Sequence, residues 1–334
     1  MKIVGFGDFL IHFSPMGDER FMQADCMKMS FTGAEANVCA ALGFWGEKAE
    51  FVTRLPEHQL AQKGIAFFRG LNVNMDHVAR GGSRMGVYFL EKGASVRSAN
   101  VIYDRSPSAI TEAVYEDFEW DEILKDADCI YLTGITPALS PNLLDCCKKL
   151  LQEASRRRIE VFYDVNYRPA LSSTEEAGNV LKELAPYITC LIGNEEHLKM
   201  LLGISSDYTE YQTKERLMDL VKQTRTMLKI PKIAMTVRRT ISASDAIIYA
   251  AFSKGEDFAV SRQYGVHVVD RVGSGDAFGA GLVYALRHGY NTEEAVEFAA
   301  ASNAMKHTIV NDINLASVEE IKAIMSKKWQ DVRR

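Results

Sequence analysis

Several features that mark other protein classes are missing from this chain of 334 residues. Its six cysteines form no C-x-x-C pair and no disulfide-like spacing, so we expect reduced thiols in a cytoplasmic protein. No apolar run approaches the roughly 18 residues that a membrane-spanning helix needs, and the opening run is too short for a signal peptide. The formal net charge of −5 argues against nucleic acid or an anionic membrane as the main partner. The sequence therefore predicts a soluble intracellular protein.

Three catalytic signatures are also absent. The chain contains no G-x-x-x-x-G-K-[ST] loop and no protein-kinase G-x-G-x-x-G with its downstream Lys and H-R-D. It has no H-E-x-x-H, and its seven histidines show no metal-ligand spacing, so we assign no metal-ligating residues. None of these three catalytic designs therefore applies to this chain.

From about residue 126 onward, short apolar runs alternate with amphipathic segments at intervals of roughly 30 residues. Buried apolar strands separated by helices predict parallel βαβ units with helices on both faces of the sheet. The expected strands are Cys129–Leu132, Val161–Tyr163, Cys190–Ile192 and Ile233–Val237, and the expected helices include Pro141–Arg157 and Thr174–Leu184. Hydrophobic residues make up 47% of the chain, enough for a large core.

The first hundred residues follow another pattern. We expect a central strand at Ile3–Phe6 and a helix over Ala34–Leu42 that ends at Gly43. Two stretches, about 9–32 and 72–106, carry short β-like runs and glycine-rich turns, and we expect antiparallel strands there, set apart from the main sheet. Such a small sheet is suited to cover a site as a lid, and its exposed apolar face favours a homodimer through it. We see no linker, so we expect one domain over residues 1–334.

The most informative segment is Asp270–Gly281, D-R-V-G-S-G-D-A-F-G-A-G, which leads directly into a helical pattern. Its glycines allow the backbone N–H groups of Gly273, Ser274 and Gly275 to turn toward one point, and a helix N-terminus adds its positive dipole end. Together they form a candidate hole for a phosphate-like anion. Asp276 stands where it can act as general base for a hydroxyl that attacks the phosphate. The alternative is an ordinary helix start with Asp276 near the cap.

A second group of polar residues follows the expected strands. Ligands of parallel sheets bind at the carboxyl ends of the strands. Three polar segments fall at those ends: Thr133–Gly134, Asp164–Arg168 and Gly193–Glu196.

The glycine–aspartate segment resembles the C-terminal signature of the ribokinase, or PfkB-type, carbohydrate kinases. Gly33–Gly43, G-A-E-A-N-V-C-A-A-L-G, resembles their N-terminal signature and lies roughly 240 residues upstream. The resemblance covers essentially the whole chain. It implies a three-layer α/β fold with a mainly parallel central sheet and a small β-sheet lid, and ATP with Mg²⁺ as cofactors.

Three further segments resemble the sugar-acid branch of that family, the 2-keto-3-deoxygluconate kinases: Tyr103–Ala109, Thr133–Pro141 and Asp164–Pro169. The resemblance implies ATP-dependent phosphorylation of the terminal hydroxyl of a keto-deoxy sugar acid. It places Gly33, Tyr88, Tyr103, Arg105, Arg168 and Asp312 around the sugar acid. It places Asn166, Asn194, Asn303, Gly273, Ser274 and Gly275 toward the nucleotide.

The residues give independent support for an acid substrate. A carboxylate is the natural partner of an arginine fork, and Arg105 and Arg168 follow a lid strand and a main-sheet strand. The alternatives are a solvated lid charge for Arg105 and an ion pair with Asp164 for Arg168. Tyr88 and Tyr103 are as readily explained by lid packing.

Three segments depart from the family pattern. Arg271 stands where Thr is common, which the sugar-acid branch tolerates. The family's Asn-x-x-Glu element appears as Asn194–His197 with His at its fourth position, which leaves Glu195, Glu196 or a water-mediated contact to organise Mg²⁺. Arg238–Ser242 replaces a glycine-containing turn near the nucleotide, and we expect an altered phosphate contact there.

Two other functions remain open. One is another sugar kinase of the same family, such as a fructokinase-like enzyme. The other is a non-catalytic sugar-acid sensor, which the altered Asn194–His197 element favours and the intact Asp276 opposes. No residue type distinguishes ketodeoxygluconate from its galactonate epimer.

Overall fold

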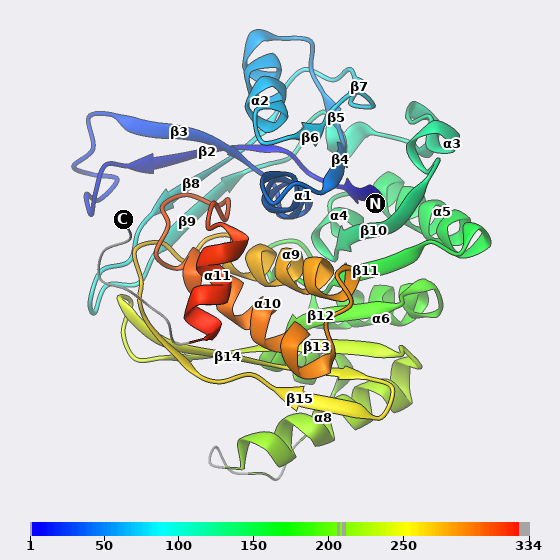
Figure 1. The fold of residues 1–334 in the computed structure, drawn as a ribbon. Coiled ribbons are helices and arrows are strands. Elements are labelled where there is room, and N and C mark those ends of the chain that lie inside the picture. The colour runs from blue at the N-terminus through cyan, green and yellow to red at the C-terminus, as the bar shows by residue number, and fades with distance from the viewer. Residues whose placement is uncertain (1, 206–207, 209–211, 327–334) are drawn as a thin grey trace.

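The computed structural model describes residues 2–205, 208 and 212–326. Its largest sheet has ten strands in the order β15-β14-β13-β12-β11-β10-β1-β4-β6, and β16 also pairs with β14 (Figure 1). The strands are β1 (Lys2–Phe6), β4 (Lys48–Val52), β6 (Val73–Asn74), β10 (Ala127–Thr133), β11 (Glu160–Asp164), β12 (Cys190–Asn194), β13 (Lys232–Thr240), β14 (Asp245–Lys254), β15 (Asp257–Val260) and β16 (Tyr264–His267).

All neighbours from β6 to β13 are parallel, whereas β14 pairs antiparallel with β13, β15 and β16. Each of the four expected strands after residue 126 lies within one of β10 to β13. The prediction of a mainly parallel central sheet is therefore confirmed. The antiparallel edge was not expected.

Helices cover both faces of this sheet (Figure 1). One buried cluster includes residues of α1 (Ala34–Phe44), α2 (Gln59–Arg69), α9 (Ser274–Arg287), α10 (Thr292–Lys306) and α11 (Val318–Met325). The other includes residues of α3 (Trp120–Ile123), α5 (Pro141–Arg157), α6 (Thr174–Leu184), α7 (Glu195–Leu202) and α8 (Thr213–Leu228). A short α4 (Ile135–Ala138) follows β10, and 3₁₀ turns lie at Ile110–Glu112, Tyr115–Asp117 and Ala185–Tyr187.

Local sequence signals explain where the outer helices begin. The Ser140 side chain accepts the N–H of Leu143 at the start of α5, whose first residue is Pro141. Ser173 and Glu176 form a capping box at the start of α6. Both helices therefore have the bounds that the sequence predicts.

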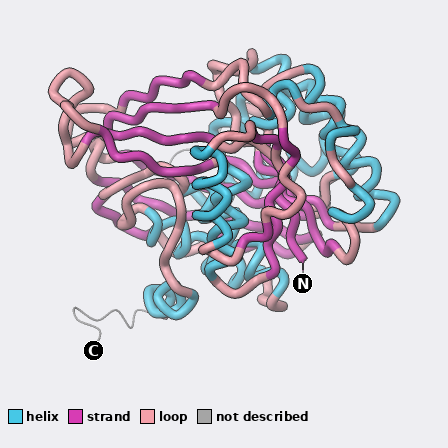
Figure 2. The backbone as a smooth tube through the Cα atoms, turned by 90° about the horizontal axis from the view of Figure 1, so that it is seen from above, coloured by secondary structure: helices cyan, strands magenta, loops and turns pink. Residues whose placement is uncertain are grey.

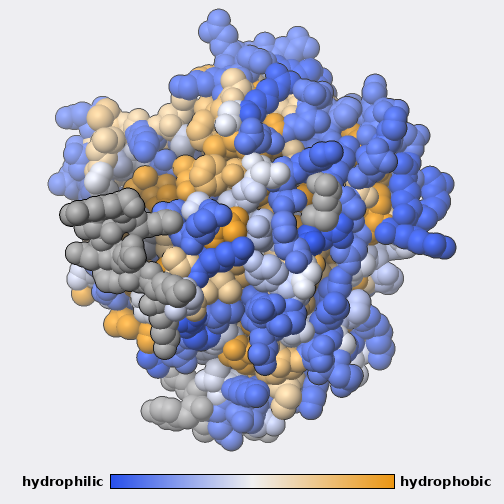
Figure 3. Space-filling model, viewed as in Figure 1, coloured by the Kyte–Doolittle hydropathy of each residue, from blue (hydrophilic) through white to orange (hydrophobic). Residues whose placement is uncertain are grey.

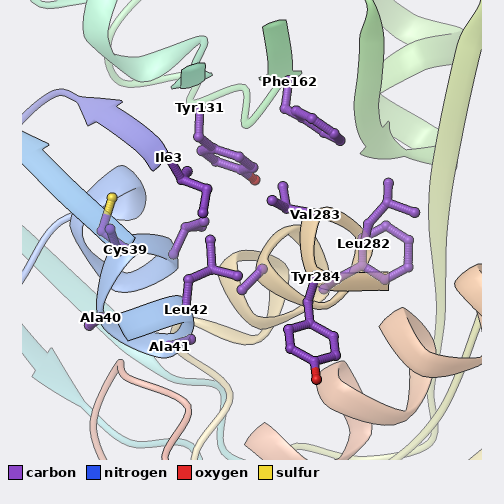
Figure 4. Close-up of a cluster of buried hydrophobic side chains, with 14 of the residues drawn as sticks. Ile3, Cys39, Ala40, Ala41, Leu42, Tyr131, Phe162, Leu282, Val283 and Tyr284 are labelled. Carbon is purple, nitrogen blue, oxygen red and sulfur yellow. The ribbon is translucent and has the colours of Figure 1, made fainter. Parts of the chain in front are cut away.

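α1 and α9 are different because they are buried almost all round, so they lack a polar face. Figure 4 shows their side chains meeting beneath the sheet, with Leu42 of α1 and Val283 of α9 near Tyr131 of β10. This packing fixes the N-termini of both helices relative to the strand ends. α1 extends to Phe44, two residues beyond its expected end.

A separate four-stranded sheet, which we call the small sheet, has the order β3-β2-β8-β9. Its strands are β2 (Leu10–Pro15), β3 (Met27–Thr32), β8 (Gly86–Glu91) and β9 (Asn100–Asp104), and a two-stranded sheet joins β5 (Arg54–Leu55) and β7 (Ala79–Arg80). The small sheet projects from the main body in Figure 1, and its strands run side by side in Figure 2. The expectation of purely antiparallel pairing is wrong, because β2 and β8 are parallel. The chain leaves the small sheet after β3, passes through the main body and re-enters in the direction of β2.

Five of the six cysteines are buried free thiols, and Cys26 is exposed. Within the described ranges, no helix combines the length and apolar character needed to cross a bilayer.

Candidate active site

The candidate site is a cavity of about 650 Å³ between the main sheet and the small sheet. The carboxyl ends of β11 and β12, the start of α9 and the inner face of the small sheet contribute to its wall. Every residue that the sequence places near sugar acid or nucleotide lines it: Gly33, Tyr88, Tyr103, Arg105, Asn166, Arg168, Asn194, Gly273, Ser274, Gly275, Asp276, Asn303 and Asp312. Residues separated by almost the full chain length therefore meet in one cavity.

Gly273 begins α9 with a φ of 72°, a backbone conformation that glycine adopts without strain. A Cβ atom there would lie 1.8 Å from the carbonyl oxygen of Asp312, so only glycine fits. The N–H of Ser274 makes a long 3.3 Å hydrogen bond to the carbonyl of Arg271. In the part of the chain that the structure describes, no protein acceptor faces the N–H groups of Gly273 and Gly275. The N–H groups of Gly273 and Gly275 are therefore the best candidate donors of the expected anion hole.

Asp276 lies in the first turn of α9 and accepts a hydrogen bond of 2.7 Å from Nδ2 of Asn37. The Thr32 hydroxyl donates to Oδ1 of Asn37 at 3.0 Å and fixes the amide orientation. Burial raises the pKa of Asp276 to about 8, against the Asn37 hydrogen bond, while the nearby Asp164 charge adds to the rise. A carboxyl group with this pKa is mostly protonated at neutral pH, and once ionised it is a stronger base than an ordinary aspartate.

Arg105 follows β9 and is only 9% exposed, so it is not a solvated lid charge. Its Nε lies 3.1 Å from Oδ2 of Asp8, and its guanidinium lies 4.7 Å from the centre of the Tyr103 ring. Asp8 is buried, and burial raises its pKa against the charge of Arg105. The ion pair and the ring hold the guanidinium at the cavity wall.

Arg168 donates to the carbonyl of Tyr167 at 3.1 Å and makes no ion pair within 4.0 Å with a described carboxylate. The alternative of an ion pair with Asp164 therefore finds no support. Asp164 instead accepts the N–H of Asn166, and burial raises its pKa to about 7. The charge of Arg168 remains available to a ligand.

Asp312 joins the small sheet to the loop before α9. The Tyr88 hydroxyl donates to Oδ1 of Asp312 at 2.5 Å, and Nδ1 of His12 lies 2.7 Å from its Oδ2. Burial opposes ionisation of Asp312, but the hydrogen bonds and charge of His12, with the Tyr88 hydroxyl, hold its pKa below the usual value. The rings of His12 and Tyr88 stack at 4.3 Å. Tyr88 thus does more than pack the small sheet.

The altered Asn194–His197 element starts α7. Oδ1 of Asn194 accepts the N–H of His197 at 2.7 Å, which caps the helix. Glu195 is buried in ion pairs with Lys199 and Arg216, so it is not free to bind a metal. Glu196 is exposed at the cavity wall. Among the described residues, no group of three His, Cys, Asp or Glu side chains is placed to hold a metal ion.

Arg238 and Arg271 line the same wall. Arg271 donates to the carbonyl of Ala243 at 2.8 Å, and no described carboxylate lies within ion-pair distance of either guanidinium. Two unpaired cations beside a helix N-terminus form an attractive environment for a polyphosphate.

Sequence reasoning missed four residues that shape this site: Asp8, His12, Glu35 and Asn37. Buried Glu35 of α1 accepts hydrogen bonds from the Thr133 N–H, the Thr133 hydroxyl and the Thr136 hydroxyl, which ties α1 to the end of β10. Glu35 and Asn37 lie inside the Gly33–Gly43 signature, and Asp8 directly follows the first strand. Their positions in the sequence could therefore have identified these three residues as parts of the site. His12 carried none, because its role depends on the pairing of β2 with β8.

Comparison with known proteins gives a consistent result. The model of the pfkB family carbohydrate kinase matches residues 1–316. The chain is similar to a 2-dehydro-3-deoxygalactonokinase of Haloferax volcanii, at 28% identity over 97% of this chain and 96% of the relative. It is similar to the structure of a 2-dehydro-3-deoxygluconokinase from Thermotoga maritima, with a TM-score of 0.94, 37% identity and 98% coverage of both chains. A proposed ribokinase II from E. coli, solved with ATP and Mg²⁺, shares the fold, with a TM-score of 0.80 at 15% identity over 98% of this chain and 99% of the other.

The raised pKa of Asp276 makes a prediction about stability. The unfolded chain loses this proton near pH 3.9, whereas the folded protein keeps it until about pH 8, so Asp276 makes the fold less stable as pH rises between these values. Asp276→Asn cannot ionise and still accepts from Asn37. We expect its melting temperature, relative to the wild type, to rise from pH 5 to pH 8.5.

Thermal melts across this pH range measure the effect, with Asp257→Asn, at an exposed position of β15, as control. If the difference in melting temperature between Asp276→Asn and the wild type does not change with pH, the pKa of Asp276 is that of an ordinary aspartate.

Proposed function

The chain belongs to the pfkB family of carbohydrate kinases, and from this premise we propose that it phosphorylates the terminal hydroxyl of 2-keto-3-deoxygluconate with ATP. The observation that carries the proposal is one cavity that holds Asp276 at the start of α9 together with the unpaired guanidinium of Arg168. A base beside an anion hole suits phosphoryl transfer, and an unpaired arginine suits a carboxylate substrate.

In the proposed step, ionised Asp276 accepts the proton of the sugar hydroxyl. The hydroxyl oxygen bonds to the γ-phosphorus as the bond between that phosphorus and the β–γ bridging oxygen breaks, and ADP leaves. The N–H groups of Gly273 and Gly275 donate to the transferring phosphoryl oxygens. Asn37 keeps the Asp276 carboxylate directed into the cavity.

We propose ATP and Mg²⁺ as the cofactors, and the donor set agrees with an ion carried by the nucleotide. Mg²⁺ prefers oxygen ligands and keeps several waters, and Glu196 at the cavity wall offers one carboxylate without a protein cage. When bound, Mg²⁺ would neutralise phosphate charge. Asn166, Asn194 and Asn303 lie on the proposed nucleotide side, and Arg238 and Arg271 add positive charge there.

The sugar acid would bind between the main sheet and the small sheet. Arg105 and Arg168 face its carboxylate, and Gly33, Tyr88, Tyr103 and Asp312 surround the rest of the molecule. Gly33 is required because a Cβ there would lie 2.1 Å from the carbonyl oxygen of Asp8. The names of the relatives divide between gluconate and galactonate substrates, so both epimers belong in the test. The hydrogen bond from Asn37 directs the Asp276 carboxylate into the cavity, as catalysis would require, and this argues against a non-catalytic sensor.

We also propose a cytoplasmic homodimer that forms through the small sheet. Directly paired residues point to one face of a sheet, and Met29, Phe13, Phe89 and Ile102 form such a row across its four strands. Ile102 is 49% exposed. Figure 3 shows hydrophobic side chains gathered over the region where β2 and β3 lie in Figure 1. A second copy of the chain would cover this apolar row.

A substrate screen tests the proposed activity. We expect ADP release with ATP, Mg²⁺ and ketodeoxygluconate or its galactonate epimer, and little release with fructose or ribose.

Asp276→Asn should lower kcat by about 10²–10⁴-fold, because the general base is lost. In the wild type, kcat/KM should fall as pH drops below about 8. Turnover of neutral sugars only, or an Asp276→Asn variant as active as the wild type, would contradict the proposal.

The two arginines should determine acid specificity. Arg105→Ala and Arg168→Ala should each lower kcat/KM for the keto acid by about 10- to 100-fold, because a charge-assisted hydrogen bond contributes roughly 1.5–3 kcal/mol. Arg84→Ala is a matched control, since Arg84 is more exposed and pairs with Asp104. Unchanged kcat/KM in both variants would rule out carboxylate recognition by arginine.

The dimer proposal is tested by mass in solution. We expect the wild type at twice the chain mass of 37.3 kDa in light scattering after gel filtration. Ile102→Asp should halve that mass because it places a charge in the apolar row. Val96→Asp, at a 97% exposed position outside the row, should leave it unchanged. A monomeric wild type would exclude the dimer.

A further inference from the structure

Lys306, the last residue of α10, is fully buried and has no part in the proposed step. Lysines are almost never fully buried unless their charge is paired, since desolvation strongly disfavours the ammonium form. Its position therefore calls for a specific role.

The ammonium group has an unusual partner. Nζ of Lys306 donates to the backbone carbonyl of Ile309 at 2.8 Å, and no carboxylate oxygen of a described residue lies within 4.0 Å. The nearby carboxylate Asp270 is paired instead with Lys92, at 3.3 Å. Burial lowers the pKa of Lys306, while the charges of Asp270, Asp312 and Asp276 act in the opposite direction.

The turn held by Lys306 is the floor of the anion hole. After α10, the carbonyl of His307 accepts the N–H groups of Val269 and Asp270, and the N–H of Asn311 donates to Oδ2 of Asp270 at 3.0 Å. These bonds fasten the turn at 307–312 to the loop that precedes α9. The carbonyl of Asp312, at the end of this turn, packs directly against Gly273.

We propose that Lys306 is a positioning residue for phosphoryl transfer: its buried ammonium group holds the 307–312 turn beneath Gly273 and places a fixed positive charge behind the anion hole. The inference rests on the proposed function. It assigns the kinase a built-in cation that supports both the transferring phosphoryl group and the ionised form of Asp276.

The charged groups around Lys306 come from several elements. Asp270 and Arg271 lie on the loop before α9, Asp276 on α9, Asp312 on the turn, Lys92 after β8 and Arg238 on β13, while burial lowers the pKa of neighbouring His307 to about 4 and so favours its neutral form. The other cations lie near the cavity wall or in an ion pair with Asp270. Loss of the Lys306 charge should therefore raise the pKa of Asp276, because less positive charge remains to favour the carboxylate.

The test compares Lys306→Met, which keeps the length but removes the charge, with Lys306→Gln, which keeps a neutral donor for the Ile309 carbonyl. We expect both to lower kcat by at least about tenfold, more than they raise KM for ATP. We expect the acidic limb of kcat/KM to move to higher pH, so that part of the loss is recovered at pH 9.5. Lys149→Met on the surface of α5 is the control and should behave as the wild type.

Chemical rescue gives a second measurement. In Lys306→Ala, methylammonium should restore activity in a saturable manner, whereas tetramethylammonium, too large for the space, should not. If Lys306→Met and Lys306→Gln fold but keep the wild-type kcat and pH profile, Lys306 is a packing residue and the proposal is wrong. If no variant folds even with methylammonium, the charge serves the fold and not the anion hole, which also overturns it.

Failure of the proposed function would look different. In that case the wild type itself would turn over no sugar acid. The effect of Lys306→Gln on the affinity for a non-hydrolysable ATP analogue, measured by calorimetry, would still report on the anion hole: weaker binding would support the positioning role, and unchanged binding would contradict it.

Discussion

The electrostatics of the cavity depend most on one half-buried carboxyl group, Asp276, in the first turn of α9. Desolvation raises its pKa to about 8, so the fold becomes less stable as pH rises from about 4 to about 8. Asn37 supplies the hydrogen bond that directs the group, and the packing of α1 against α9 fixes the distance between the two helices. These contacts hold the Asp276 side chain in one orientation at the cavity wall.

Asp312 connects the two ends of the cavity. Its side chain is held by Tyr88 and His12 of the small sheet, while its backbone carbonyl packs against Gly273 of the anion hole. Asp312 therefore links the small sheet to the start of α9, beside the Lys92–Asp270 ion pair.

The sequence predicted the parallel sheet well because apolar runs and caps are local signals: β10 to β13 and the bounds of α5 and α6 follow directly from them. The thirteen residues that the family resemblance assigns to substrate, nucleotide and catalysis also line one cavity. It failed where a contact depends on pairing between distant segments. The parallel pairing of β2 with β8, the Asp8–Arg105 ion pair and the His12–Asp312 contact have no local pattern. Buried Lys306 was missed for the same reason, since nothing in its neighbourhood marks it as buried.

The account stands on the titration of Asp276 in the free enzyme. The most direct measurement is ¹³C NMR of the aspartate side-chain carboxyl groups across pH 3–10, with the Asp276 signal identified by its absence in the Asp276→Asn variant. We predict one carboxyl signal that titrates near pH 8, above the Asp164 signal near pH 7, and that disappears with the Asp276→Asn substitution. A signal that titrates near pH 4, as in an exposed aspartate, would contradict it.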